Sequence, residues 1–232
     1  MLNVPKPDRA ARLIDLSHTI EDGMITYQGL PGPVICDYWS REDSAANYDD
    51  GSTFQMGRID LVSNTGTYLD APFHRFADGR DLAQLDLNRL SGVPGIVVRQ
   101  PFAAGLAIGA AAFAGIDLRG KAVLVHTGWD RHWRSDAYFT DHPFLTSAAA
   151  DLLVARGVAL VGIDSHNIDD TRTRSRPVHT TLLGADVPIC EHLTGLAQLP
   201  DAGFRFSAVP PPIKGMGTFP VRAHAFLDDQ AA

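Results

Sequence analysis

The sequence has few cysteines, no long apolar run and no surplus of basic residues, and each shortage excludes a class of protein. Among 232 residues there are two cysteines, Cys36 and Cys190, too few for a disulfide framework or a cysteine-based zinc site. No stretch offers the roughly 20 apolar residues that span a bilayer, and the N-terminus lacks the apolar segment of a secretory signal. The formal net charge of -7 argues against a nucleic-acid or anionic-membrane partner. We therefore expect a cytoplasmic protein.

What the sequence contains is the composition of a globular protein, 45% hydrophobic and 20% charged. It has neither an internal repeat nor a low-complexity linker, so we predict one domain over residues 1–232. Short apolar or alternating runs dominate and predict β-strands. The predicted strands are Arg12–Ile20, Phe54–Val62, Gly95–Arg99, Ala122–His126, Val158–Ile163 and Val221–Leu227. The pattern indicates a mixed α/β fold with much sheet and few long helices.

One helix has clear boundaries in the sequence. The segment Ser147–Arg156 follows Thr146, a good N-cap residue, and precedes Gly157, which suits the position after a helix C-terminus. The helix lies between two apolar runs, Ala122–His126 and Val158–Ile163. We expect a βαβ unit whose two strands are parallel and whose crossover is right-handed.

Nine histidines are the unusual feature of the composition, because histidine is the commonest metal ligand and acid/base group. The segment Ser63–Phe76 contains Gly66 and Pro72, which predict an irregular loop or a short turn. Within it, Asp70 and His74 form either an acid/base pair or two metal ligands. The alternative, which spacing alone favours, is that Asp70 caps a turn and His74 is an ordinary polar residue.

Further candidates follow the strand Val158–Ile163, because polar groups beyond the carboxyl ends of strands often line active sites. These candidates are Asp164, His166, Asp169 and Asp170. The alternative is a structural role, in which these aspartates form solvent-exposed salt bridges with the arginines that follow. In that case Asp169 and Asp170 pair with Arg172, Arg174 and Arg176, unless one arginine holds an anionic substrate group. His179 and Glu191 come later, and only the fold can bring them to a shared site.

Taken together, these segments resemble the cyclase-like metal-dependent hydrolase family, which includes bacterial kynurenine formamidases and isatin hydrolases. The resemblance covers nearly the whole chain, from Ile14–His18 through His126–Trp129 and Gly162–Asp164 to Lys214–Arg222. It implies a swivelling β/β/α fold, usually in homodimers or larger homo-oligomers, and hydrolysis of an amide or lactam-type bond in a small substrate.

The chain departs from the family pattern H-x-G-T-H-x-D-x-P-x-H at two positions. Its segment Asn64–His74 keeps the glycine, threonine, aspartate, proline and last histidine, but Asn64 and Tyr68 replace two histidines that bind metal in the family. The family's later histidine and glutamate ligands match His179 and Glu191. An amide and a phenol are weak ligands for zinc at neutral pH.

Two interpretations follow from this departure. In the first, one divalent metal, Zn²⁺ or Mn²⁺, is held by Asp70, His179 and Glu191, and His74 is the proton shuttle that the resemblance implies. Tyr68 and Asn64 then act as hydrogen-bond donors toward the substrate carbonyl or the oxyanion. In the second, no cofactor binds, and the same acidic and imidazole groups form a protein-only acid/base cluster.

The function expected from the first interpretation is hydrolysis of a small cyclic or aryl amide or lactone, as in an arylformamidase. The second interpretation favours a metal-independent cyclase, isomerase or lyase acting on a small cyclic or polyketide-like substrate. A third possibility is a binding protein without activity, in which Asn64 and Tyr68 mark decay of the site, although the retained polar residues argue against it.

Overall fold

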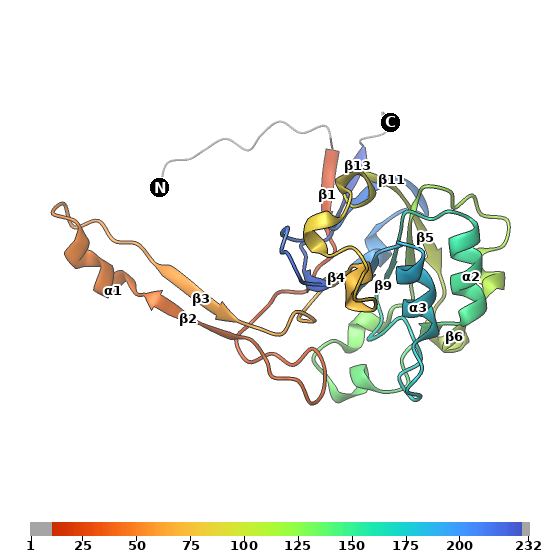
Figure 1. The fold of residues 1–232 in the computed structure, drawn as a ribbon, viewed down its shortest axis with the longest axis horizontal. Coiled ribbons are helices and arrows are strands. Elements are labelled where there is room, and N and C mark those ends of the chain that lie inside the picture. The colour runs from red at the N-terminus through yellow and green to blue at the C-terminus, as the bar shows by residue number, and fades with distance from the viewer. Residues whose placement is uncertain (1–10, 229–232) are drawn as a thin grey trace.

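The structure, a computed structural model, describes residues 11–228. Its body is a curled nine-stranded mixed sheet with the strand order β1-β13-β11-β5-β7-β9-β10-β4-β12 (Figure 1). The strands are β1 (Ala11–Asp15), β2 (Val34–Trp39), β3 (Met56–Asp60), β4 (Tyr68–Asp70), β5 (Val93–Arg99), β6 (Ala107–Ile108), β7 (Ala122–His126), β8 (Phe144–Leu145), β9 (Leu160–Ile163), β10 (Ile189–Glu191), β11 (Ala202–Ser207), β12 (Thr218–Pro220) and β13 (His224–Asp228). The α-helices are α1 (Arg41–Ser44), α2 (Ser147–Ala155) and α3 (Pro177–Gly184).

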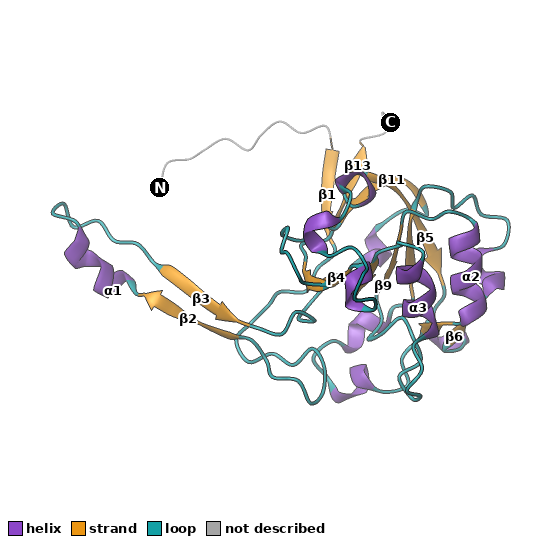
Figure 2. Ribbon diagram, viewed as in Figure 1, coloured by secondary structure: helices purple, strands orange, loops and turns teal. Residues whose placement is uncertain are grey.

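The middle of the sheet is parallel and buried on both faces. Strands β5, β7, β9 and β10 pair in parallel, as the apolar runs predict. In β7, Ala122 and Leu124 pack into one hydrophobic cluster, whereas Val123 and Val125 pack into the other. Helices α2 and α3 lie against the face of the second cluster (Figure 2). The sheet therefore has core on both sides, which confirms a mixed α/β fold with few helices.

The predicted βαβ unit is present, because β7 and β9 are parallel neighbours and α2 lies between them in the sequence. The Thr146 hydroxyl accepts a hydrogen bond from the Ala149 amide and caps the helix, as predicted. Gly157 follows the helix with φ +67°, a conformation that L side chains rarely adopt. None of the helices in residues 11–228 has the length and apolar character needed to cross a membrane.

The prediction of an irregular loop over Ser63–Phe76 is wrong at its centre. Residues 68–70 form β4, which pairs with β10 on one side and β12 on the other and is buried throughout. Three residues are too few to show a strand periodicity, and Gly66 and Pro72 at the ends obscure the strand further. The terminal strands are also shorter or shifted: the predicted strands Arg12–Ile20 and Val221–Leu227 are β1 and β13.

Residues 34–60 form an arm that projects away from the body (Figure 1). The arm consists of the antiparallel ribbon β2–β3, closed at its far end by α1 and a turn. The predicted strand Phe54–Val62 is β3, but it pairs with β2 rather than with the main sheet. Every residue of both strands is exposed. Residues 61–67 connect the end of β3 to β4. The arm is therefore attached next to the strand that carries the candidate residues Tyr68 and Asp70.

Candidate active site

Three neighbouring strands at one edge of the sheet bring the candidate residues together. In the β10–β4 register, Glu191 lies opposite Tyr68, and in the β4–β12 register, Thr218 lies opposite Asp70. These pairings connect segments more than 100 residues apart in the sequence. All four side chains are buried, with at most 2% of each residue exposed. The strand register therefore builds the polar floor of the site.

Asp70 and His74 are linked through a hydroxyl. The Thr218 hydroxyl makes a short hydrogen bond to Asp70 Oδ1 and lies 2.8 Å from His74 Nδ1. An ionised carboxylate only accepts, so the Thr218 proton goes to Asp70 and the hydroxyl oxygen accepts from His74 Nδ1–H. In a neutral imidazole this arrangement places the hydrogen on Nδ1 and leaves Nε2 as the acceptor. Gly217 permits the close approach, because a Cβ there would lie 2.2 Å from the His74 backbone nitrogen.

His179 is held in one orientation by Asp169. The Asp169 carboxylate accepts from the backbone amides of Val178 and His179 at the start of α3, at 2.8 and 3.0 Å. Asp169 Oδ2 also accepts from His179 Nδ1, at 2.7 Å. One carboxylate thus caps the helix and fixes the imidazole tautomer. The predicted pairing of Asp169 with the following arginines is wrong, whereas Asp170 does pair with Arg172, at 2.9 Å.

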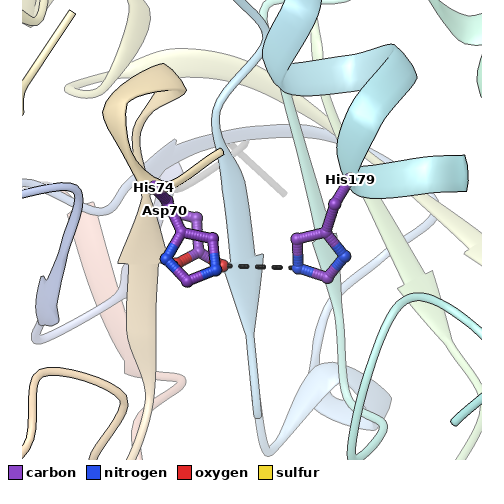
Figure 3. Close-up of side chains that lie close together, drawn as sticks. All are labelled: Asp70, His74 and His179. Atoms are coloured by element: carbon purple, nitrogen blue, oxygen red, sulfur yellow. Dashed lines mark ion pairs between the residues drawn. The ribbon is translucent and has the colours of Figure 1, made fainter. Parts of the chain in front are cut away.

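The other nitrogen of His179 faces two carboxylates. His179 Nε2 lies 3.7 Å from Asp70 Oδ2 and 3.8 Å from Glu191 Oε1 (Figure 3 shows Asp70, His74 and His179). Burial alone lowers the pKa of His179, but the charges of Glu191 and Asp70 and the hydrogen bond to Asp169 outweigh it and raise the pKa to about 10. A positive charge at Nε2 is therefore strongly favoured.

Glu191 is held by a donor at each oxygen. The Tyr68 hydroxyl donates to Oε2 and the Ile168 amide donates to Oε1, both at 2.6 Å. Burial raises the pKa of the Tyr68 phenol well above its ordinary value, so this phenol stays neutral and keeps its donor proton. Tyr68 therefore acts as a hydrogen-bond donor to Glu191.

The polar floor opens into a cavity of about 290 Å³, close to the lower end of the range for small-molecule sites. Besides Tyr68, His74, His179 and Glu191, its wall contains Asn64, Tyr27, Asn167, Leu30, Arg75 and Arg176. The predicted site residues Asn64, Tyr68, Asp70, His74, His179 and Glu191 thus line or adjoin one cavity. Its size suits a substrate with one or two rings, and its wall offers amide and phenol groups for polar contacts.

The donor set fits a single divalent cation. Two ligands about 2.1 Å from one ion are roughly 3 to 4 Å apart, which matches the separations of His179 Nε2 from Asp70 and Glu191. Asp70 Oδ2 is buried with no hydrogen-bond partner, an unusual state for a carboxylate oxygen. Asp169 on Nδ1 is the support that a metal-binding imidazole normally has. Among residues 11–228, Asp70, His74 and His179 are the group of three whose ligand atoms all lie within 4.8 Å of one another, and Glu191 is not part of that group.

Two other candidates, Asp164 and His166, lie outside the cavity wall. Asp164 is buried and accepts hydrogen bonds from Thr127 and Gly128, so it anchors the turn after β7. Burial raises the pKa of its carboxyl to about 7. His166 is buried against the rings of Tyr27 and Tyr138. Sequence reasoning missed the parts played by Asp169 and Thr218, since neither has a local pattern that reports a distant histidine.

Comparisons with known proteins identify a matching family model, related sequences and solved structures with the same fold. A family model described as "Putative cyclase" matches residues 14–170. The kynurenine formamidase of Geobacillus thermodenitrificans is 29% identical over 213 residues, which is 90% of this chain and 95% of that protein. A solved structure described as a potential metal-dependent hydrolase with cyclase activity is 26% identical, with a TM-score of 0.76 over 95% of this chain and all of the other. Isatin hydrolase A from Labrenzia aggregata, bound to benzyl benzoate, has the same fold, with a TM-score of 0.80 at 21% identity over 95% of each chain.

Proposed function

The chain belongs to the cyclase family, and from that premise we propose that it is a hydrolase of a small aryl amide, lactam or lactone. The observation that carries the proposal is the group Asp70, His74 and His179, with Asp70 and His179 buried, at a cavity of about 290 Å³. Curated relatives named kynurenine formamidase and solved structures of isatin hydrolases support the same reaction class. Hydrolysis of such a bond needs an activated water, a stabilised oxyanion and a proton for the leaving group.

Asp70, His179 and Glu191 would hold one Zn²⁺ or Mn²⁺ in this proposal, which the separations of 3.7 and 3.8 Å between His179 Nε2 and the two carboxylates support. When bound, such an ion supplies activation of water and polarisation of the substrate carbonyl. Proton and cation compete for His179 Nε2, since Asp169 keeps Nδ1 protonated. Tyr68 restricts Glu191 to one orientation and leaves Oε1 facing His179.

His74 moves the proton. Its Nε2 is basic because Thr218 and Asp70 retain the hydrogen on Nδ1. His74 takes a proton from the attacking water as the carbon–oxygen bond forms. It then returns that proton to the leaving nitrogen or oxygen as the bond to carbon breaks. Asn64, on the cavity wall, is placed to donate to the oxyanion through its side-chain amide.

The test is hydrolysis of N-formylkynurenine and isatin, followed by absorbance, with Zn²⁺ or Mn²⁺ supplied. We expect turnover of an aryl formamide or a lactam, and a loss of about 10²- to 10⁴-fold in kcat for His74→Ala. His224→Ala, on strand β13 at the far part of the sheet, is the matched control and keeps the wild-type rate. An unchanged rate in His74→Ala would remove the proton-shuttle role, and no turnover of any aryl amide or lactone would remove the hydrolase.

A second function is favoured by one observation, the raised pKa of His179. An imidazolium between Asp70 and Glu191 places a positive charge where the cation would lie, and such a cluster suits a metal-independent cyclase, isomerase or lyase. Activity that resists exhaustive treatment with a chelator would favour this function, and activity that returns only with added metal would favour the hydrolase.

A further inference from the structure

Asn167 is a buried residue on the cavity wall whose side-chain amide is held at both ends. Its Oδ1 accepts a hydrogen bond from the Asp169 backbone amide at 2.9 Å, and its Nδ2 donates to the Tyr27 hydroxyl. That hydroxyl donates its own proton to the His166 carbonyl, at 3.2 Å, so it can only accept from Asn167. The two partners therefore fix the orientation of the amide, including which end carries the hydrogens.

One hydrogen of this amide is uncommitted. An asparagine amide carries two hydrogens, and the Tyr27 hydroxyl accepts one of them. The other has no acceptor among residues 11–228. A donor at a buried position is destabilising when nothing accepts from it, and only 6% of Asn167 is exposed. Because Asn167 lines the cavity, a ligand bound there can supply the acceptor.

The other uncharged polar groups on the cavity wall are less suited to donate to a ligand. Tyr68 gives its proton to Glu191, and Tyr27 gives its proton to a backbone carbonyl, so neither phenol has a hydrogen left. The Asn64 side chain makes a single hydrogen bond within the described part of the chain, from the serine hydroxyl that precedes it, at 3.1 Å. Asn167 is thus the donor with a fixed orientation, and fixed donors are the ones that stabilise a transition state.

The two residues that follow Asn167 place it beside the reacting centre. The Ile168 amide donates to Glu191 Oε1 at 2.6 Å, and the Asp169 carboxylate holds His179 Nδ1 at 2.7 Å. Glu191 Oε1 and His179 Nε2 are 3.8 Å apart. One short segment therefore orients the cavity donor, the glutamate and the histidine together.

We infer that Asn167 is a catalytic residue that donates a hydrogen bond to the oxygen of the scissile carbonyl. This inference rests on the proposed function and adds a residue to it. As the water oxygen bonds to the carbonyl carbon, the π electrons of the carbonyl move onto its oxygen. Negative charge that develops near the buried carboxylates of Asp70 and Glu191 needs a donor, and the Asn167 N–H supplies it without transferring a proton. Tyr27 is a positioning residue, because it acts through Asn167.

Steady-state kinetics on N-formylkynurenine, with Zn²⁺ or Mn²⁺ supplied, test the catalytic role. We expect Asn167→Ala to lower kcat about 10²- to 10³-fold and to leave KM within about threefold of the wild-type value. Asn88→Ala is the matched control, because Asn88 is exposed and absent from the cavity wall, and it keeps the wild-type kcat. A wild-type kcat in Asn167→Ala, or a rise in KM alone, overturns the inference.

A second variant guards against a general loss of structure. Asn167→Asp keeps the shape of the side chain and the acceptor for the Asp169 amide. At about pH 8, well above the ordinary carboxyl pKa of about 4, it has no hydrogen to donate. We expect a loss of kcat at least as large as in Asn167→Ala, and a wild-type kcat in this variant overturns the inference.

Tyr27→Phe tests the positioning role. It removes the acceptor that holds the Asn167 amide, and we expect kcat to fall by about threefold to thirtyfold. Because Tyr27 acts through Asn167, adding Tyr27→Phe to Asn167→Ala should lower kcat no further. A role of Tyr27 in structure alone gives losses that add in the double variant, and that result overturns the positioning role.

Binding without turnover separates the donor from the hydrolase proposal. Oxindole, which has a lactam carbonyl, and indoline, which has a methylene group in its place, are compared by calorimetry on the full chain with the same metal. We expect the preference for oxindole to fall about threefold to tenfold in Asn167→Ala. That fall supports the donor even when no formamide is hydrolysed. An unchanged preference overturns it even when hydrolysis is found.

Discussion

Asp169→Asn is the substitution that examines the candidate site most closely. Asp169 receives three hydrogen bonds, from the amides of Val178 and His179 and from His179 Nδ1. Asparagine has one acceptor oxygen and presents an NH₂ group where the second oxygen was. If its oxygen stays on Val178, two donors face each other at His179. When a cation displaces one proton from the imidazolium, the wild-type ring keeps its remaining proton on Nδ1, facing Asp169. In the variant we expect the remaining proton on Nε2, the nitrogen between Asp70 and Glu191.

The size of the effect follows from these contacts. Losing one charge-assisted hydrogen bond and part of a helix cap lowers the free energy of unfolding by about 2 to 4 kcal/mol. For a chain of this length that corresponds to a fall in Tm of roughly 5 to 15 °C. A proton on Nε2 blocks the metal-facing nitrogen of His179, and loss of such a supporting carboxylate weakens metal affinity by about 10- to 100-fold.

Two assays report these quantities separately. Thermal unfolding by circular dichroism gives the stability, and competition with a chromophoric chelator gives the Kd for Zn²⁺ or Mn²⁺. Asp170→Asn is the matched control, because Asp170 pairs with Arg172 at the surface and such pairs contribute about 1 kcal/mol or less. Wild-type metal affinity in Asp169→Asn would refute the reasoning, and so would an equal loss of metal affinity in both variants.

Further predictions concern the floor and the core. Tyr68→Phe leaves one oxygen of Glu191 without its donor and should lower the free energy of unfolding by about 1 to 3 kcal/mol, measured by urea denaturation. Gly217→Ala forces β12 away from the backbone of residues 72–74 and should reduce kcat by about tenfold or more, whereas Gly109→Ala, with no atom near its Cβ, should not. Burial lowers the pKa of His166 to about 3, so its stabilisation is complete above the unfolded pKa of about 6.5 and is lost as the pH falls toward 3. His166 should therefore make the free energy of unfolding about 2 to 3 kcal/mol lower at about pH 4.5 than at about pH 7.5. We expect this difference between the two pH values to be smaller in His166→Gln.

Local patterns in the sequence predict the parallel centre of the sheet and its crossover helix. The strand Ala122–His126 is apolar as far as Val125 because both of its faces are buried, and the Thr146 cap and Gly157 mark the ends of α2. Local patterns do not predict the strand at 68–70 or the pairing of strands in the arm. β4 owes its strand conformation to neighbours on both sides rather than to its own three residues, and β2 has no buried face to impose an alternating pattern.

The site could be predicted in part, and only through the family resemblance. Asp70, His179 and Glu191 are distant in sequence, and strand register together with the position of α3 brings them to one place. Their roles, and the proton-transfer role of His74, stay predictions. The supports of the site were not foreseen, because a hydrogen bond from Thr218 to a strand 148 residues away follows from tertiary pairing alone.

The metal content of the wild-type chain tests the central claim most directly. Protein purified without chelator and equilibrated with Zn²⁺ or Mn²⁺ is analysed for metal beside His179→Ala. We predict one ion per wild-type chain, because His179 Nε2 lies 3.7 Å from Asp70 and 3.8 Å from Glu191, and background levels in the variant. Less than about a tenth of an equivalent in the wild type, or equal occupancy in His179→Ala, would contradict the account.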